Sequence, residues 1–188
     1  MRTFKRILSQ IPLCLAWIII STVFWGWIFT LATDTVPAKK VTVFIDAYKV
    51  EDTYLSARLE EDMPSGLKMI KVHPFSYTVF DSHTINNADI FIVRAGDIET
   101  YITEFIPISA DGEHEYYYHD GSPYGIKVYD AKTGEGIASE YITYYTSQTE
   151  EYDCYLFFCK NSPHIGKENG AADGFAFDIA DILINLKH

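Results

Sequence analysis

The residues best suited to chemistry in this chain lie in the segment INNADIFIVRAGDIETY, residues 85–101. An apolar run, IFIV, is followed by Arg94, Gly96 and Asp97 and then by a stretch with helical character. The guanidinium of Arg94 can hold a carboxylate or phosphate through two parallel hydrogen bonds. Backbone amides after Gly96 can assist at the start of a helix, where Asp97 is the expected N-cap. One interpretation of the segment is therefore a ligand site.

The same segment also has a purely structural interpretation. Arg94 would then pair with Asp46 or Asp97 and stabilise the edge of a sheet, and Gly96 would only permit the turn. A single glycine is not a phosphate loop, and neither GxGxxG nor GxxxxGK(S/T) occurs in the sequence. If the segment forms a ligand-facing turn, Asp46 and Arg94 should lie near each other at the carboxyl edge of the sheet.

Other polar residues also follow apolar runs. In an open α/β sheet, ligands bind beyond the carboxyl ends of the strands. We therefore expect a ligand-binding set of Asp46, Tyr48, Ser76, Tyr77, Arg94 and Asp97, and the strand ends also supply His73, Asn161, Ser162 and His164.

Metal binding and catalysis have weaker support. The acidic segment that contains Asp111, Glu113, His114, Glu115, His119 and Asp120 has ligand types that suit calcium or zinc. Its spacing fits neither an EF-hand nor HExxH, so a solvated acidic loop is the alternative. Ser162 precedes His164 without a G-x-S-x-G elbow. We expect no metal, no cofactor and no catalytic residue, with an unrecognised hydrolase as the remaining alternative.

Tyrosines are concentrated in the second half of the chain. Tyrosine combines apolar area with a polar tip, which suits interfaces and sugar-binding surfaces. Ordinary packing on a sheet is the alternative. The tyrosines concerned are Tyr116, Tyr117, Tyr118, Tyr124, Tyr129, Tyr141, Tyr144, Tyr145, Tyr152 and Tyr155.

The elements that must position these residues alternate between strands and helices. This order predicts an α/β fold with a small, mainly parallel sheet and right-handed crossovers. Parallel strands are expected at 41–45, 67–72 and 89–93, and further strands at 126–129 and 154–159. Helices are expected at 50–63, 98–105 and 171–186. The remaining segments allow two interpretations each: a short helix or turn at 78–87, a polar loop or hairpin at 110–125, and a strand or helix at 136–145. Cys154 and Cys159 should point to opposite faces of one strand and stay unbridged.

The N-terminus predicts a membrane anchor. Residues 11–32 carry no charge and are long enough, at about 33 Å as a helix, to cross a bilayer core. A cleaved signal peptide is the alternative. Basic residues near Met1 favour a cytoplasmic N-terminus. The expected order is a basic cytoplasmic segment at 1–10, a transmembrane signal-anchor helix at 11–33 in the lipid bilayer, a linker at 34–40 and an extracytoplasmic domain at 41–188.

The charge of the predicted domain limits its partners. Residues 34–188 contain 12 basic and 26 acidic side chains, a net charge of −14. Such a charge argues against nucleic acid as a partner, because phosphates would be repelled.

The first half of the domain resembles one lobe of an extracellular solute-binding protein. The resemblance rests on KVTVFIDAYKVEDTYLSARLEEDMPSGLKMIKV and NADIFIVRAGDIETY, with Gly66-Leu67-Lys68 and Ala88-Asp89-Ile90 at the family's strand starts, over residues 40–105. The family has two lobes and is commonly tethered by a lipidated cysteine. This chain has room for one lobe, and Cys14 is wrongly placed for lipidation.

Together these features predict a single-pass, membrane-anchored extracytoplasmic binding domain. The resemblance implies that it is non-catalytic and binds a small solute or a partner protein, such as a membrane transport or envelope protein. The alternative is a structural or assembly subunit of a cell-envelope or transporter complex.

Overall fold

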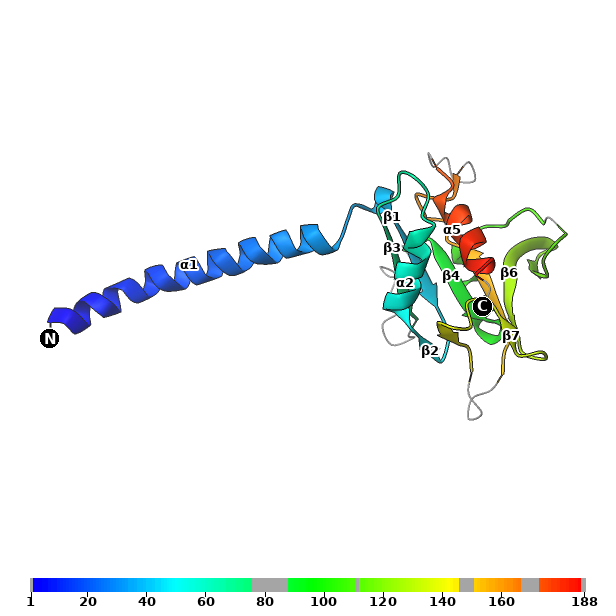
Figure 1. Cartoon of the computed structure of the whole chain (residues 1–188), viewed down its shortest axis with the longest axis horizontal. Helices are drawn as coiled ribbons and strands as arrows, with labels where there is room; N and C mark the ends of the chain where they lie inside the picture. The colour runs from blue at the N-terminus through cyan, green and yellow to red at the C-terminus, as the bar shows by residue number, and fades with distance from the viewer. Residues whose placement is uncertain (1, 76–87, 111, 146–150, 167–172, 187–188) are drawn as a thin grey trace. The chain divides into compact units, whose positions relative to one another are not determined.

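A computed structural model of the chain describes residues 2–75, 88–110, 112–145, 151–166 and 173–186. The chain packs as two separate units, residues 1–36 and residues 37–188 (Figure 1). The first unit contains the long N-terminal helix, and the second contains every strand of the described chain.

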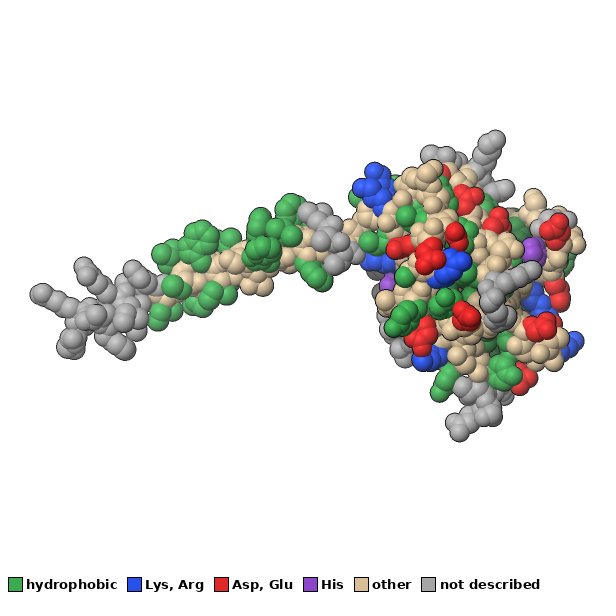
Figure 2. Space-filling model, viewed as in Figure 1, with side chains coloured by type: hydrophobic (Ala, Val, Ile, Leu, Met, Phe, Trp, Pro, Cys, Tyr) green, Lys and Arg blue, Asp and Glu red, His purple; other side chains and the backbone are tan. Residues whose placement is uncertain are grey.

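Helix α1 spans Arg2–Thr33. Within it, Ile11–Phe29 is long and apolar enough to cross a membrane, and the side chains of this stretch are not buried in the protein. Hydrophobic side chains cover it in the space-filling view, whereas acidic side chains are spread over the visible face of the second unit (Figure 2).

The second unit is built on a seven-stranded mixed sheet with the order β3-β1-β4-β9-β6-β5, in which β7 also pairs with β6. Its strands are β1 (Lys40–Ile45), β3 (Met69–Pro74), β4 (Ile90–Arg94), β5 (Tyr116–His119), β6 (Ser122–Asp130), β7 (Glu135–Gly136) and β9 (Cys154–Phe158). Strands β3, β1 and β4 are mutually parallel, which confirms that prediction. Strands β9, β6, β5 and β7 are antiparallel to their neighbours.

Shorter elements complete the unit. A two-stranded antiparallel sheet joins β2 (Lys49–Val50) to β8 (Ile142–Thr143). The helices are α2 (Asp52–Glu61), α4 (Ile98–Tyr101) and α5 (Phe175–Ile184), with 3-10 turns at η1 (Pro37–Lys39), η2 (Ala95–Asp97) and η3 (Ile102–Glu104). The α/β class is confirmed, and the predicted element at 78–87 lies outside the described residues.

The polar segment at 110–125 contains a hairpin. Strands β5 and β6 are joined through Asp120 and Gly121, which both have positive φ. Two consecutive residues of this conformation match the right-handed twist of antiparallel strands. The Asp-Gly pair therefore selects the tight hairpin over the open loop that the sequence also allowed.

Each face of the sheet carries its own hydrophobic core. Helices α2 and α5 lie side by side over one face (Figure 1), where Leu55 and Leu59 pack with Ile179 and Leu183. The opposite face is covered by the segment from Ile98 to Phe105 and its aromatic neighbours. Apolar side chains at helical spacing explain why both helices bury one side.

Strand β9 serves both cores because successive side chains alternate between faces. Cys154 belongs to the core under α2 and α5, and Cys159 belongs to the other. Both are buried free thiols, as predicted. Burial is the main cause that raises the pKa of Cys154 to about 12, so this thiol stays protonated at neutral pH.

Helix α2 also covers the outer edge of β3. The amide of Ile70 donates to Glu60 Oε1 at 3.1 Å, and the amide of Val72 donates to Ser56 Oγ at 3.0 Å. Without these acceptors, the edge strand would present unpaired donors to other chains. The two side chains therefore close this edge of the sheet.

Candidate functional site

One edge of the sheet collects the ends of four strands. Strands β1, β3 and β4 are parallel, and β6 runs in the same direction as β4 because both are antiparallel to β9. We call this the carboxyl edge. It is the edge at which ligands bind in open α/β sheets.

Asp46 and Arg94 form an ion pair at the carboxyl edge. Arg94 Nη2 lies 2.7 Å from Asp46 Oδ1, and the exposed fraction of the side chain is 32% for Arg94 and 1% for Asp46. The backbone amide of Asp46 donates to the carbonyl of Ile92 at 2.9 Å. The predicted proximity of the two residues is confirmed. A carboxylate this deeply buried depends on its cation, so the pair stabilises the fold.

The guanidinium of Arg94 is incompletely used. Its Nε atom is buried and makes no hydrogen bond to the described residues. Buried polar atoms are normally paired, and exceptions tend to mark places where a water or ligand group is missing. Arg94 is therefore both a structural partner of Asp46 and a candidate contact for a bound molecule.

Two further side chains surround the pair. Tyr101 is buried, and burial, followed by the charges of Asp97 and Asp46, raises its pKa. Cys154 is opposite Arg94 in the register of β4 and β9. Burial raises the pKa of this thiol most, the charge of Asp46 raises it further, and the charge of Arg94 lowers it.

The other predicted ligand residues have different surroundings. Tyr48 is 60% exposed, and its amide donates to the carbonyl of Tyr144 at 3.4 Å. Asp97 precedes α4, but the prediction that it caps this helix is wrong, because its side chain makes no capping hydrogen bond. Its backbone is already helical in the turn η2, whereas a capping residue normally has extended geometry. Ser76 and Tyr77 lie outside the described residues.

A hollow of about 580 Å³ lies near the carboxyl end of β6. We call it the tyrosine hollow. It is lined by Tyr129, Gly134, Gly136, Ser139, Ile142, Thr143, Tyr144, Tyr145 and Glu151. In the strand register, Cys154 of β9 is opposite Tyr129 on one side and Arg94 on the other, so one residue lies between the hollow and the ion pair.

Three tyrosines define the walls of the hollow. The rings of Tyr129 and Tyr144 are stacked with centroids 4.5 Å apart, and the ring of Tyr145 lies 5.8 Å from that of Tyr129. The hydroxyl of Tyr144 donates to the carbonyl of Ile137 at 3.1 Å. A Cβ on Gly136 would lie 2.7 Å from one stacked ring and 2.8 Å from the other. Only glycine therefore fits beside this stack.

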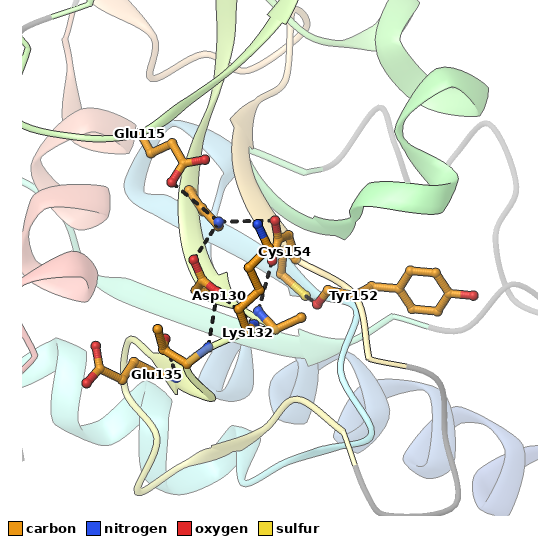
Figure 3. A network of polar contacts seen from close by, with 10 residues as sticks. Glu115, Asp130, Lys132, Glu135, Tyr152 and Cys154 are labelled. Carbon is orange, nitrogen blue, oxygen red and sulfur yellow. Dashed lines mark hydrogen bonds and ion pairs between the residues drawn. The ribbon is translucent and has the colours of Figure 1, made fainter.

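A charged network holds the β6–β7 turn beside the hollow (Figure 3). The Lys127 Nζ atom lies 2.7 Å from Asp130, 3.1 Å from Asp153 and 3.3 Å from Glu115. Asp130 Oδ1 also accepts hydrogen bonds from the amides of Lys132 and Thr133. Three carboxylates surround one ammonium, so the network retains an excess of negative charge.

The pKa values of the network reflect this arrangement. Burial by itself lowers the pKa of Lys127, but the hydrogen bonds from its ammonium to Asp130 and Asp153 outweigh burial and raise it. The hydrogen bond from Lys127 lowers the pKa of Asp130. Lys127 and Asp130 are therefore both ionised at neutral pH.

Ser162 and His164 lie at the opposite edge of the sheet, which corrects the expectation that they accompany the ligand set. Strand β9 is antiparallel to β4, so its carboxyl end lies beside the start of β4. Ser162 Oγ donates to Asp89 Oδ1 at 2.5 Å, and the amide of His164 donates to Ser162 Oγ at 3.0 Å. We call this the amino edge.

The ring of His164 is fully enclosed at the amino edge, with an exposed fraction of 0%. Nε2 donates to the carbonyls of Pro37 and Lys40 at 2.9 and 3.1 Å, and Nδ1 donates to Asp173 Oδ1 at 2.7 Å. Both nitrogens face acceptors, which requires the doubly protonated ring. Neither nitrogen is directed at Ser162 Oγ, so the arrangement is not that of a nucleophilic serine and its base.

The acidic hairpin does not gather metal ligands in the part of the chain that the structure describes, where no three of its His, Cys, Asp and Glu side chains converge on one point. His119 lies 3.7 Å from Glu99 and 3.5 Å from Asp120. Asp111 lies outside the described residues.

Comparison with known proteins yields a distant structural likeness. No family model and no curated protein matches the sequence. Among solved structures, thiaminase I from Bacillus thiaminolyticus matches with a TM-score of 0.37 and 12% identity, over 48% of this chain and 28% of that chain. The match is distant and covers less than half of this chain.

This comparison corrects one expectation. The chain was expected not to be an enzyme, yet the matched structure, thiaminase I, is an enzyme.

The structure adds residues to the candidate site that the sequence did not single out. Tyr129, Tyr144 and Tyr145 were visible only as members of a long tyrosine-rich region, and Cys154 only as a buried thiol. The strand register brings them to Arg94, and no local motif carries that information.

Proposed function

We propose that this chain is a single-pass membrane protein whose domain lies outside the cytoplasmic membrane and binds a small solute at the carboxyl edge of its sheet. The observation that carries the proposal is the tyrosine hollow beside the Asp46–Arg94 pair. Its volume, about 580 Å³, is within the range of small-molecule sites, which combine apolar walls with a few polar groups.

Each part of the carboxyl edge has a role in this proposal. The tyrosine rings supply apolar area at little cost in side-chain entropy, and their hydroxyls supply polar tips. The buried ion pair keeps Arg94 in a fixed position, so its partly exposed guanidinium can donate a hydrogen bond to an uncharged acceptor on a ligand. Tyr48, Ser76, Tyr77 and Asp97 complete the predicted binding set.

The binding proposal is tested with the full chain in lipid nanodiscs and a panel of small solutes, by thermal unfolding. A ligand should raise the melting temperature of wild type and of Tyr54→Ala, whose exposed ring lies on α2. The same ligand should have little effect on Tyr145→Ala, because that ring lines the hollow. A panel that leaves wild type unchanged, or a shift that survives in Tyr145→Ala, would contradict binding at the hollow.

The membrane proposal rests on the apolar stretch Ile11–Phe29 and on the distribution of basic residues. Arg2, Lys5 and Arg6 precede the stretch, and the next basic residues are Lys39 and Lys40. Added protease should degrade the domain in intact spheroplasts of a bacterial host and leave a cytoplasmic marker intact. A domain protected until the membrane is opened would reverse the orientation, and a domain released into the medium would indicate a cleaved signal.

A further inference from the structure

We infer that the tyrosine hollow selects a small organic cation, an ammonium group on a compact apolar body. The inference rests on the proposed binding function and adds the chemical class of the ligand. It follows from the lining of the hollow, from the charges around it and from one buried tyrosine hydroxyl.

The lining combines aromatic rings with a single charged side chain. Tyr129, Tyr144 and Tyr145 provide rings, and Glu151 provides a carboxylate. No lysine or arginine is among the described residues that line the hollow. The faces of aromatic rings attract cations electrostatically, and several rings together favour quaternary and alkylated ammonium groups.

Two cations on the strands around the hollow are already paired with carboxylates. Arg94 is held by Asp46 at 2.7 Å. Lys127, on the same strand as Tyr129, is surrounded by three carboxylates, those of Glu115, Asp130 and Asp153. Together these six groups carry net negative charge, which favours a cation and repels an anion.

Tyr129 supplies a position for hydrogen bonding. This residue is 3% exposed. Burial, followed by a hydrogen bond with the side chain of Tyr145, raises its pKa, so the hydroxyl is neutral and has lone pairs that can accept from an N–H donor. An ammonium N–H can donate to this oxygen, whereas an aliphatic ligand cannot.

The experiment measures the binding of three probes of similar size to the full chain in nanodiscs of neutral lipid. Butylammonium is the cation, butyrate the anion and 1-butanol the neutral control, and isothermal titration gives each Kd. We expect butylammonium to bind at least about tenfold more tightly than the other two probes, from its combined contacts with rings and carboxylate. Tighter binding of butyrate or butanol would overturn the inference and leave the binding proposal in place.

Two variants assign the selectivity to the hollow. Glu151→Gln keeps the shape of the lining and removes its charge, so it should weaken butylammonium binding about five- to tenfold and leave butanol binding unchanged. Glu61→Gln, which removes an exposed carboxylate on α2, should change neither. Equal effects of both variants would assign the preference to overall charge and overturn the inference. If no probe and no solute in the wider panel binds, the proposed function fails with it.

Discussion

The two edges of the central sheet use buried charge in different ways. At the amino edge, Asp89, Ser162 and His164 are enclosed. Hydrogen bonds engage both ring nitrogens of His164 and both carboxylate oxygens of Asp89. At the carboxyl edge, Arg94 is 32% exposed and its Nε atom lacks a described partner. A hollow lined by tyrosines opens beside the second group.

This difference separates a structural polar cluster from a candidate binding site. Enclosed polar groups with complete hydrogen bonding leave nothing for a ligand to complete, and their loss should affect stability. Groups that are half-open and partly unsatisfied are available to a ligand, and their loss should affect binding as well as stability. The four predictions below test this distinction, beginning with the largest expected effect.

Replacing His164 by alanine should cause the largest loss. The variant removes a buried cation from Asp173 and leaves the carbonyls of Pro37 and Lys40 without their donor. Breaking a buried charge pair typically costs about 3–5 kcal/mol of unfolding free energy. Denaturation followed by circular dichroism measures it, with the exposed His114→Ala as control. A loss below about 1 kcal/mol would show that the amino edge is not a structural cluster.

Replacing Arg94 by alanine should cost less, about 2 kcal/mol, because the buried Asp46 loses its partner but the arginine itself is partly solvated. Adding Asp46→Asn should restore part of the loss, since the uncompensated charge is then removed. Denaturation of the two single variants and the double variant measures the coupling. Unchanged stability in Arg94→Ala would assign the arginine to ligand binding alone.

These edges also show how much the sequence could predict. The parallel strands at 41–45, 67–72 and 89–93 were predictable because apolar β-branched runs alternate with helical periodicity. The meeting of Asp46 and Arg94 followed from those strands. The position of His164 could not be predicted in the same way. It follows β9, so the edge of the sheet at which it lies depends on whether β9 is parallel or antiparallel to β4. A buried strand such as CYLFF has the same apolar pattern in either direction.

The tyrosine hollow lies beyond sequence reasoning for a related reason. Its walls come from β6, from the segment after β8 and from Glu151, and they meet through strand register and the close approach of Gly136. The abundance of tyrosine indicated a region. Only the tertiary structure distinguishes the stacked rings of Tyr129 and Tyr144 from exposed rings such as Tyr118.

The third prediction concerns pH at the amino edge. Burial by itself lowers the pKa of His164, but its hydrogen bonds to Asp173 and Pro37 outweigh burial and raise the pKa in the folded state. The stabilisation is therefore complete below about pH 6.5 and is lost as pH rises through the raised pKa. Burial is the main cause that raises the pKa of Asp89, so its contribution to the free energy of unfolding also falls as pH rises above about 4.

Unfolding free energies between pH 5 and 9 measure this decline, whose slope from His164 is at most about 1.4 kcal/mol per pH unit. His164→Gln should remove the part above pH 6.5 that His164 causes. It should also raise the pKa of Asp89 further, because the charge of His164 lowers that pKa, and so enlarge the part that Asp89 causes. Arg94→Ala should keep both parts, because it changes the carboxyl edge. A wild-type stability that rises over this range would contradict the doubly protonated ring.

The smallest effect is expected at the outer edge of β3, which extends the comparison to a third boundary of the sheet. Ser56 Oγ accepts from the amide of Val72, so Ser56→Ala should cost about 1 kcal/mol and speed hydrogen exchange of that amide. Thr53→Ala on the same helix is the matched control, since alanine improves helix propensity at both positions, but of the two side chains only that of Ser56 bonds to β3. If the amide hydrogen of Val72 exchanges equally fast in both variants, the side chain of Ser56 does not protect the edge strand. If only Ser56→Ala speeds exchange, the outer edge of β3 resembles the amino edge, because in both places side chains of the protein itself complete the hydrogen bonding. The carboxyl edge then differs from both, because Arg94 Nε makes no hydrogen bond there to the described residues.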